Sequence, residues 1–185
     1  MHPKKGSPDH FTGNERVDKR LYVQSSKKTL VAFFSHSGNT RVIAEQIKDI
    51  TGGEIFEIKP VKDYPSAYQA VVDQAKKEIT ANYKPQLQIE VENFDTYDVF
   101  FVGSPNWWST IAPPVATFLS AYDFKGKTII PFITHEGSRM GHSVADMKKI
   151  CPTATIVDEH SFRGSNVRSA QDEVFEWLRK SKIMN

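Results

Sequence analysis

The segment over residues 29–47 restricts the fold more than any other part of the sequence. It begins with the apolar run TLVAFF, and that run ends at the hydroxyl-rich turn SHSGNT. A helical pattern follows at once, because Ile43, Ile47 and Ile50 share one helix face. A strand, a tight turn and a helix N-terminus together form an anion site, since the first helical turn has free N–H groups and the positive end of the dipole. We therefore expect residues 35–40 to bind a phosphate group.

Two well-known phosphate loops do not fit this turn. A Walker loop ends in Gly-Lys-Ser/Thr, and residues 35–40 contain no lysine or arginine. A dinucleotide fingerprint needs three spaced glycines, and only Gly38 is present. A response-regulator receiver would place acidic residues around its first strands, whereas this strand ends in Phe33, Phe34 and Ser35. The phosphate must therefore be held by backbone N–H groups and hydroxyls.

Strand and helix patterns alternate along the rest of the chain. The apolar runs predict strands over residues 29–34, 54–58, 98–103, 128–133 and 154–157. The helical spacing predicts helices over residues 39–51, 67–80, 112–121, 143–150 and 167–180. This alternation predicts an α/β fold with a doubly wound five-stranded parallel sheet in the order 2-1-3-4-5. Its ligand loops should follow the first, third and fourth strands, at their carboxyl ends.

The loop after the third strand contains two adjacent tryptophans in the sequence GSPNWWST. Two exposed aromatic rings at the mouth of a sheet are costly, and a planar ligand ring stacked on one of them would bury it. We expect Trp107, which is nearer the strand end, to face such a ring and Trp108 to pack mainly as a core residue. The loop after the fourth strand, THEGSRMGHS, supplies backbone donors, and Gly137 allows close approach of its backbone.

These three loops resemble those of the short-chain flavodoxin-like proteins of bacteria, and the likeness covers nearly all of residues 29–180. The first loop matches the pattern Ser/Thr-x-Ser/Thr-Gly-x-Thr, followed by Ala44 in the helix. The resemblance implies a flavodoxin-like three-layer sandwich and non-covalently bound FMN. It implies that the cofactor contacts Ser35, His36, Ser37, Gly38, Asn39, Thr40, Ser104, Pro105, Asn106, Trp107, Trp108, Thr134, His135, Glu136, Gly137 and Ser138.

The expected function is electron transfer through this flavin. The alternative is an FMN-dependent NAD(P)H:quinone oxidoreductase, or a reductase of another small acceptor. Dedicated carriers of the family are usually strongly acidic and often have a glycine in the ring-contacting loop, whereas residues 104–110 contain none. We predict no catalytic side chain and no metal site, because the histidines lack ligand-like spacing. A hydrolase is excluded by the absence of a Gly-x-Ser-x-Gly elbow.

The basic charge of the chain is concentrated at its start. Residues 1–28 contain seven Lys or Arg and three Asp or Glu, whereas the whole chain has 24 and 22. We therefore expect an N-terminal polar and basic arm over residues 1–28 and one FMN-binding domain over residues 29–185. Its partners would be a redox protein, or NAD(P)H and a small acceptor. In reductases of this kind a second subunit often covers the flavin, so a homodimer is also possible. Nucleic acid is not expected, because acidic residues interrupt the basic ones.

Two further expectations follow from the composition. No hydrophobic stretch is long enough for a signal peptide or a transmembrane helix, so we expect a cytoplasmic protein that does not bind a membrane. The only cysteine, Cys151, excludes a disulfide within the chain, and we expect it to be a packed, unreactive thiol.

Overall fold

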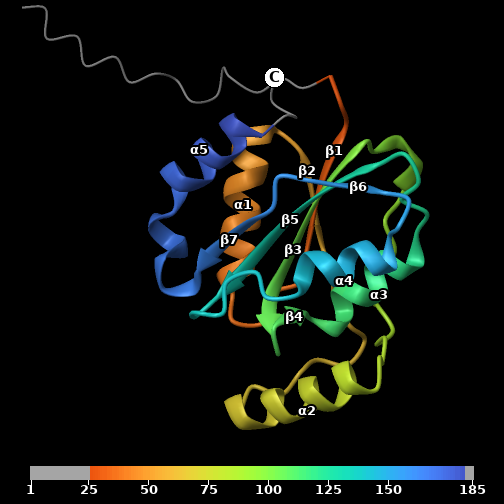
Figure 1. Cartoon of the computed structure of the whole chain (residues 1–185), viewed down its shortest axis with the longest axis vertical. Coiled ribbons are helices and arrows are strands. Elements are labelled where there is room, and N and C mark those ends of the chain that lie inside the picture. The colour runs from red at the N-terminus through yellow and green to blue at the C-terminus, as the bar shows by residue number, and fades with distance from the viewer. Residues whose placement is uncertain (1–25, 182–185) are drawn as a thin grey trace, which may run out of the picture.

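The computed structural model describes residues 26–181, so most of the arm expected over residues 1–28 lies outside the described residues (Figure 1). Strands and helices alternate from β1 (Thr29–Phe33) onward. The remaining elements are α1 (Asn39–Thr51), β2 (Glu54–Glu57), α2 (Tyr68–Thr80), the 3-10 helix η2 (Phe94–Thr96), β3 (Val99–Trp107), β4 (Thr110–Ile111), α3 (Pro113–Ala121), β5 (Thr128–His135), α4 (Ser143–Ile150), β6 (Thr155–Ile156), β7 (His160–Arg163), the 3-10 helix η3 (Gly164–Ser169) and α5 (Gln171–Lys180).

The strands form a sheet in the order β2-β1-β3-β5-β6, and all neighbours along this path are parallel. Because β5 and β6 are the fourth and fifth of the expected strands, the predicted order 2-1-3-4-5 is confirmed. In the central register Phe33 lies opposite Gly103, and Gly103 lies opposite Phe132. The carboxyl ends of β1, β3 and β5 therefore meet at one edge of the sheet.

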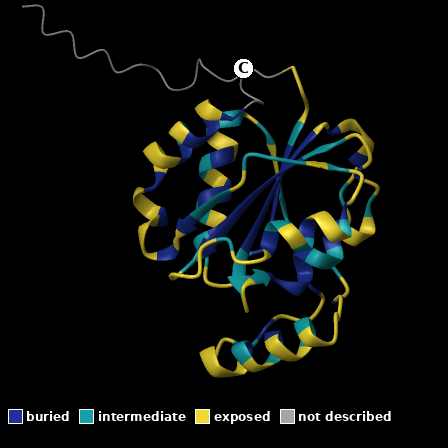
Figure 2. Cartoon of the chain, viewed as in Figure 1, coloured by how far each residue is buried: buried dark blue, intermediate teal, exposed yellow. Residues whose placement is uncertain are grey.

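Two hydrophobic cores cover the two faces of the sheet. The core on one face contains Ile43 and Ile47 of α1 together with Val174 and Leu178 of α5. The core on the other face includes residues of α3 and α4, among them Phe118 and Met147. Figure 2 shows the strands as the most buried part of the molecule, between these two layers of helices. No helix within residues 26–181 combines the length and the apolar character needed to cross a membrane.

The carboxyl-terminal part of the fold differs from the sequence prediction in two places. The expected strand over residues 154–157 is present as the short β6, and β7, which the sequence did not predict, is a further strand that also pairs with β5. Between them Asp158 has a left-handed φ of 56°, a conformation that aspartate tolerates better than most residues, and its carbonyl accepts a hydrogen bond from Trp177 Nε1 at 2.7 Å. The last helix is also divided, since η3 occupies the start of the range predicted as one helix.

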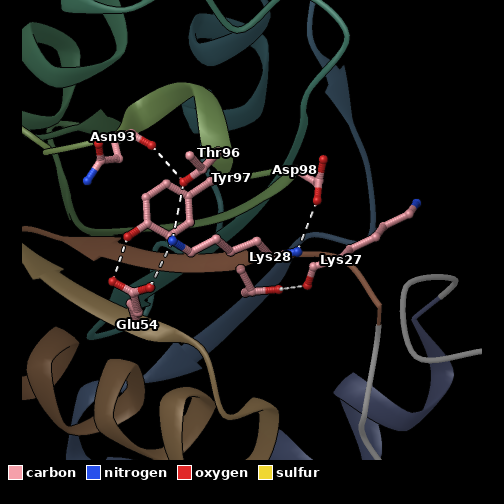
Figure 3. A network of polar contacts seen from close by, with 8 residues as sticks. Lys27, Lys28, Glu54, Asn93, Thr96, Tyr97 and Asp98 are labelled. Carbon is pink, nitrogen blue, oxygen red and sulfur yellow. Dashed lines mark hydrogen bonds and ion pairs between the residues drawn. The ribbon is translucent and has the colours of Figure 1, made fainter.

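A network of polar contacts fastens the start of β1 at the opposite, amino end of the sheet (Figure 3). The Lys28 N–H donates to Asp98 Oδ2 at 3.0 Å, and its ammonium lies 3.2 Å from Glu54 Oε1. Tyr97 donates its hydroxyl proton to the same carboxylate at 2.6 Å. The Tyr97 hydrogen bond, followed by the one from Lys28, lowers the pKa of Glu54. Lys28 therefore joins β1, β2 and the start of β3.

We predict that Gly103→Ala destabilises the domain strongly. A methyl group at this position would meet Phe132 Cζ at 2.1 Å, in the middle of the sheet register. Overpacking of this kind costs about 1–3 kcal/mol, and more where the neighbour cannot move. The measurement is urea denaturation of the full chain. Gly53→Ala is the control, because its nearest contacts, with Thr29 and Thr51, would be at 3.2 Å and need shifts of only a few tenths of an ångström. Equal losses of stability in the two variants would contradict the argument.

Candidate functional site

The turn over residues 35–40 leaves the N-terminus of α1 open. Gly38 is the N-cap residue, with a left-handed φ of 95°, and no side chain caps the helix. Its N–H donates to Ser35 Oγ at 3.1 Å, so the first serine shapes the turn itself. The first turn of α1 contains no acidic residue. Its unpaired N–H groups are therefore directed at a point where an anion can bind.

A buried hydroxyl pair joins this turn to the end of β5. Thr40 Oγ1 and Thr134 Oγ1 lie 2.8 Å apart, and the two residues are only 1% and 4% exposed. One hydroxyl must donate to the other, so one proton of the pair remains available for a ligand. The structure thus brings together two predicted site residues from loops that are far apart in the sequence.

Residues 104–111 form a β-hairpin where the sequence predicts a loop. β3 continues to Trp107 and pairs with β4, with Trp107 opposite Thr110. The turn between the strands is made by Trp108 and Ser109, which have left-handed φ values of 51° and 65°. Ser104 faces inward, because its hydroxyl donates to Pro105 O and accepts the Ala112 N–H. These two hydrogen bonds of the Ser104 hydroxyl therefore stabilise the hairpin.

The two tryptophans of the hairpin have opposite environments. Trp107 is partly buried and makes edge-to-face contacts with Tyr64, Phe34 and His36, at centroid distances of 4.9, 5.4 and 5.8 Å. It therefore lies against the first ligand loop. The expectation that Trp108 packs as a core residue is wrong, because it is 49% exposed. The left-handed turn directs its indole outward, where Nε1 donates to Val72 O at 3.0 Å.

The hairpin is fastened to the loop that follows β5. Asn106 Nδ2 donates to Arg139 O at 2.7 Å, and the His142 N–H donates to Ser109 O at 2.6 Å. Gly141 is required at this contact, since a Cβ there would lie 2.4 Å from Ser109 O. Asn106 Oδ1 is buried and has no hydrogen-bond partner among residues 26–181. A buried acceptor of this kind suits an N–H group of a bound ligand.

The imidazole of His135 is held in one tautomer. The Gly137 N–H donates to its Nδ1 at 2.9 Å, so the ring proton is on Nε2. Burial lowers the pKa of His135, and the positive charges of Arg139 and Arg163 act in the same direction against the opposing charge of Glu136. His135 is therefore a neutral hydrogen-bond donor at the end of β5. Its neighbours Gly137 and Ser138 are exposed.

Gly164 lies against two of the predicted site residues, and the sequence reasoning did not include it. A Cβ at this position would lie 2.1 Å from Glu136 Oε1 and 2.5 Å from Asn39 Nδ2. The side chains of two predicted site residues thus meet over its Cα. Gly164 directly follows β7, a strand that the sequence pattern did not predict, so the sequence carried no signal for it.

Two other features do not involve the predicted cofactor residues. A cavity of about 580 Å³ is bounded by the end of α2, β4, α3 and α4, and none of the predicted cofactor residues lines it. Cys151 is buried, as expected of a packed thiol, and burial raises its thiol pKa to about 11, which disfavours the reactive thiolate. Within the described range, no three His, Cys, Asp or Glu residues are grouped as metal ligands.

Comparison with solved structures identifies close structural relatives. A candidate flavoprotein of Bacteroides eggerthii is 31% identical over 80% of this chain and 98% of its own, with a TM-score of 0.69. One from Bacteroides uniformis is 27% identical over 83% and 99%, with a TM-score of 0.75. A flavoprotein of Lactobacillus acidophilus, solved in complex with FMN, is 26% identical over 78% and 98%, with a TM-score of 0.66.

The family comparison covers almost the entire described part of the chain. No curated protein matches the sequence. The model of the flavodoxin family matches residues 28–181, which include the sheet, both helical layers and all three ligand loops. The chain therefore belongs to the flavodoxin family.

Proposed function

We propose that this protein binds FMN non-covalently and transfers electrons through it. The observation that carries the proposal is the open N-terminus of α1, surrounded by hydroxyls and joined to β5 by the Thr40–Thr134 pair. This arrangement suits a phosphate monoester. The Lactobacillus relative was solved with FMN, which supports the same cofactor here.

The residues at the carboxyl edge fit the parts of FMN. Residues 35–40 would hold the phosphate, and residues 104–107 with 134–138 would surround the ring. Trp107 offers a flat apolar surface next to the phosphate loop. The unpartnered Asn106 Oδ1 would accept a ring N–H, and neutral His135 would donate from Nε2. Gly164, which has no side chain, leaves room for the side chains of Asn39 and Glu136 between the two loops.

The protein would tune the flavin through these contacts. FMN itself supplies a ring that accepts and releases electrons. The aromatic cluster of Phe34, Tyr64 and Trp107 keeps water from one side of the site. His135 stays neutral and offers a donor without adding positive charge. A reduced, anionic ring would thus receive hydrogen bonds in place of a salt bridge.

One observation favours the second candidate function, an FMN-dependent reductase of a small acceptor such as a quinone, supplied by NAD(P)H. The charged residues near the site include Arg139, Arg163 and Lys76, against Glu136 and Glu78, the second of which accepts the Tyr64 hydroxyl proton. An acidic face for docking a basic protein partner is therefore not formed by these residues. A positive rim suits a small anionic acceptor better.

The first test compares FMN with riboflavin. The phosphate adds charge-assisted hydrogen bonds, each worth about 1.5–3 kcal/mol, so FMN should bind the full chain at least about tenfold more tightly. Titration followed by flavin fluorescence measures both affinities. Similar dissociation constants for the two flavins would contradict a phosphate site at residues 35–40.

A second prediction concerns the buried hydroxyl pair. Thr40→Val leaves the Thr134 hydroxyl buried without its partner and should cost about 1–3 kcal/mol of apo-protein stability. The double variant Thr40→Val/Thr134→Val should regain most of this loss, because both polar groups are then removed. Its FMN affinity should remain reduced.

The measurements for this pair are urea denaturation of the apo-protein and FMN titration. Thr51→Val is the control at the other end of α1, where the hydroxyl donates to Ile47 O. Full FMN affinity in the double variant would show that the pair is purely structural.

A third prediction concerns Trp107. Trp107→Ala should weaken FMN binding about tenfold and shift the flavin absorption bands, since an aromatic stack contributes about 0.5–1.5 kcal/mol beyond its buried area. Trp107→Phe should retain much of the affinity. Absorption spectra and titrations of both variants provide the measurement. Unchanged bands and affinity in Trp107→Ala would show that this ring does not touch the flavin.

A further inference from the structure

An exposed aromatic and cationic surface lies where the hairpin meets α2. Figure 1 places α2 beyond the carboxyl ends of the strands, beside β4, and Figure 2 shows most of its surface exposed. Only Val71 and Ala75 of this helix are buried. Tyr68, Val72 and Lys76 are four residues apart and therefore share one face of α2.

Trp108 lies along this face in a fixed orientation. Its Nε1 donates to Val72 O at 3.0 Å, and Lys76 Nζ lies 4.8 Å from the centroid of its ring. Nearly half of the indole, 49%, is exposed, and Tyr68 one turn earlier is 80% exposed. We call Tyr68, Lys76 and Trp108 the Trp108 platform.

The backbone conformation that exposes the Trp108 ring is strained. A left-handed φ is uncommon for a bulky residue, and Trp108 and Ser109 both have one. Asparagine or glycine would make the same two-residue turn with less strain. The turn is nevertheless held firmly, since Ser109 O accepts the His142 N–H at 2.6 Å. Stability alone therefore does not explain a tryptophan at position 108.

We propose that the Trp108 platform binds the electron acceptor of the flavin, a planar aromatic compound with an anionic group, such as a quinone sulfonate or carboxylate. The flat acceptor would stack on the exposed part of Trp108, and its anionic group would pair with the Lys76 ammonium. Trp107 and Trp108 are consecutive, so the platform adjoins the wall of the flavin site. This inference rests on the proposed FMN function and adds the chemical class and the location of the acceptor.

The redox step balances with the reactants named. Bound FMN in its reduced form would supply two electrons and one proton. The quinone takes the two electrons, that proton and a second proton from water, and becomes a hydroquinone. NAD(P)H or a reducing protein partner then reduces the flavin again with two electrons.

The binding test uses anthraquinone-2-sulfonate and the full chain loaded with FMN. Calorimetry should show that Trp108→Asn weakens binding about tenfold, because the stacking surface is lost while the turn is retained. Lys76→Gln should weaken binding severalfold and reduce its salt dependence, with FMN affinity unchanged. The control Tyr83→Ala removes another exposed aromatic ring, 54% exposed, and should change nothing.

A kinetic arm connects binding with electron transfer. When the photoreduced protein is mixed with anthraquinone-2-sulfonate, Lys76→Gln should raise the half-saturating concentration by the same factor as the dissociation constant and leave the limiting rate unchanged. Cationic methyl viologen should show no such dependence on Lys76.

The outcomes separate this inference from the proposed function. If FMN binds normally and anthraquinone-2-sulfonate binds equally well to the wild type, Trp108→Asn and Lys76→Gln, the platform is not the acceptor site. The inference would also be overturned if Lys76→Gln changed the dissociation constant of anthraquinone-2-sulfonate but left its half-saturating concentration unchanged. Failure of the wild type to bind FMN would instead remove the proposed function. If Trp108→Asn does not fold, the Lys76→Gln variant and the salt dependence of anthraquinone-2-sulfonate binding still test whether the platform is the acceptor site.

Discussion

The pairing of β3 between β1 and β5 is the constraint on which the rest of this structure depends. The register Phe33–Gly103–Phe132 leaves no room for a side chain at position 103, so the observed alignment of the three strands requires glycine at this point. Because the strands are parallel, their carboxyl ends are brought to one edge. The N-terminus of α1, the hairpin and the loop after β5 then share that edge, and the candidate FMN site follows from their proximity.

The loops at this edge are joined to one another as well as to the sheet. Thr40 bonds to Thr134, Asn106 bonds to the Arg139 carbonyl, and Ser109 accepts the His142 N–H. Such links hold the proposed phosphate and ring contacts in place before a ligand arrives, which reduces the entropy lost on binding. These links are accompanied by backbone strain, because Trp108, Ser109 and Arg139 have left-handed φ values. Strain of this kind is typical of functional sites.

Several parts of the fold and site could be predicted from the sequence. The bounds of α1 and α4 agree with the helical spacing, and Gly52, with its left-handed φ of 70°, ends α1 as expected. The strand order also agrees. These features depend on local patterns and on the general rule that parallel strands need helical crossovers. The choice of the hydroxyl turn as an anion site is equally local, because strand, turn and helix are contiguous in the chain.

The sequence by itself therefore determined the α/β class, the strand order and which three loops share the ligand edge. Only the tertiary structure decided how those loops meet: that residues 104–111 form a hairpin, that Trp107 faces Tyr64 while Trp108 faces α2, and that Gly164 lies under Asn39 and Glu136. The physical reason is that each contact joins residues distant in sequence. Periodicity reports which face of an element is buried, but the partner on that face is selected by packing and hydrogen bonding between loops.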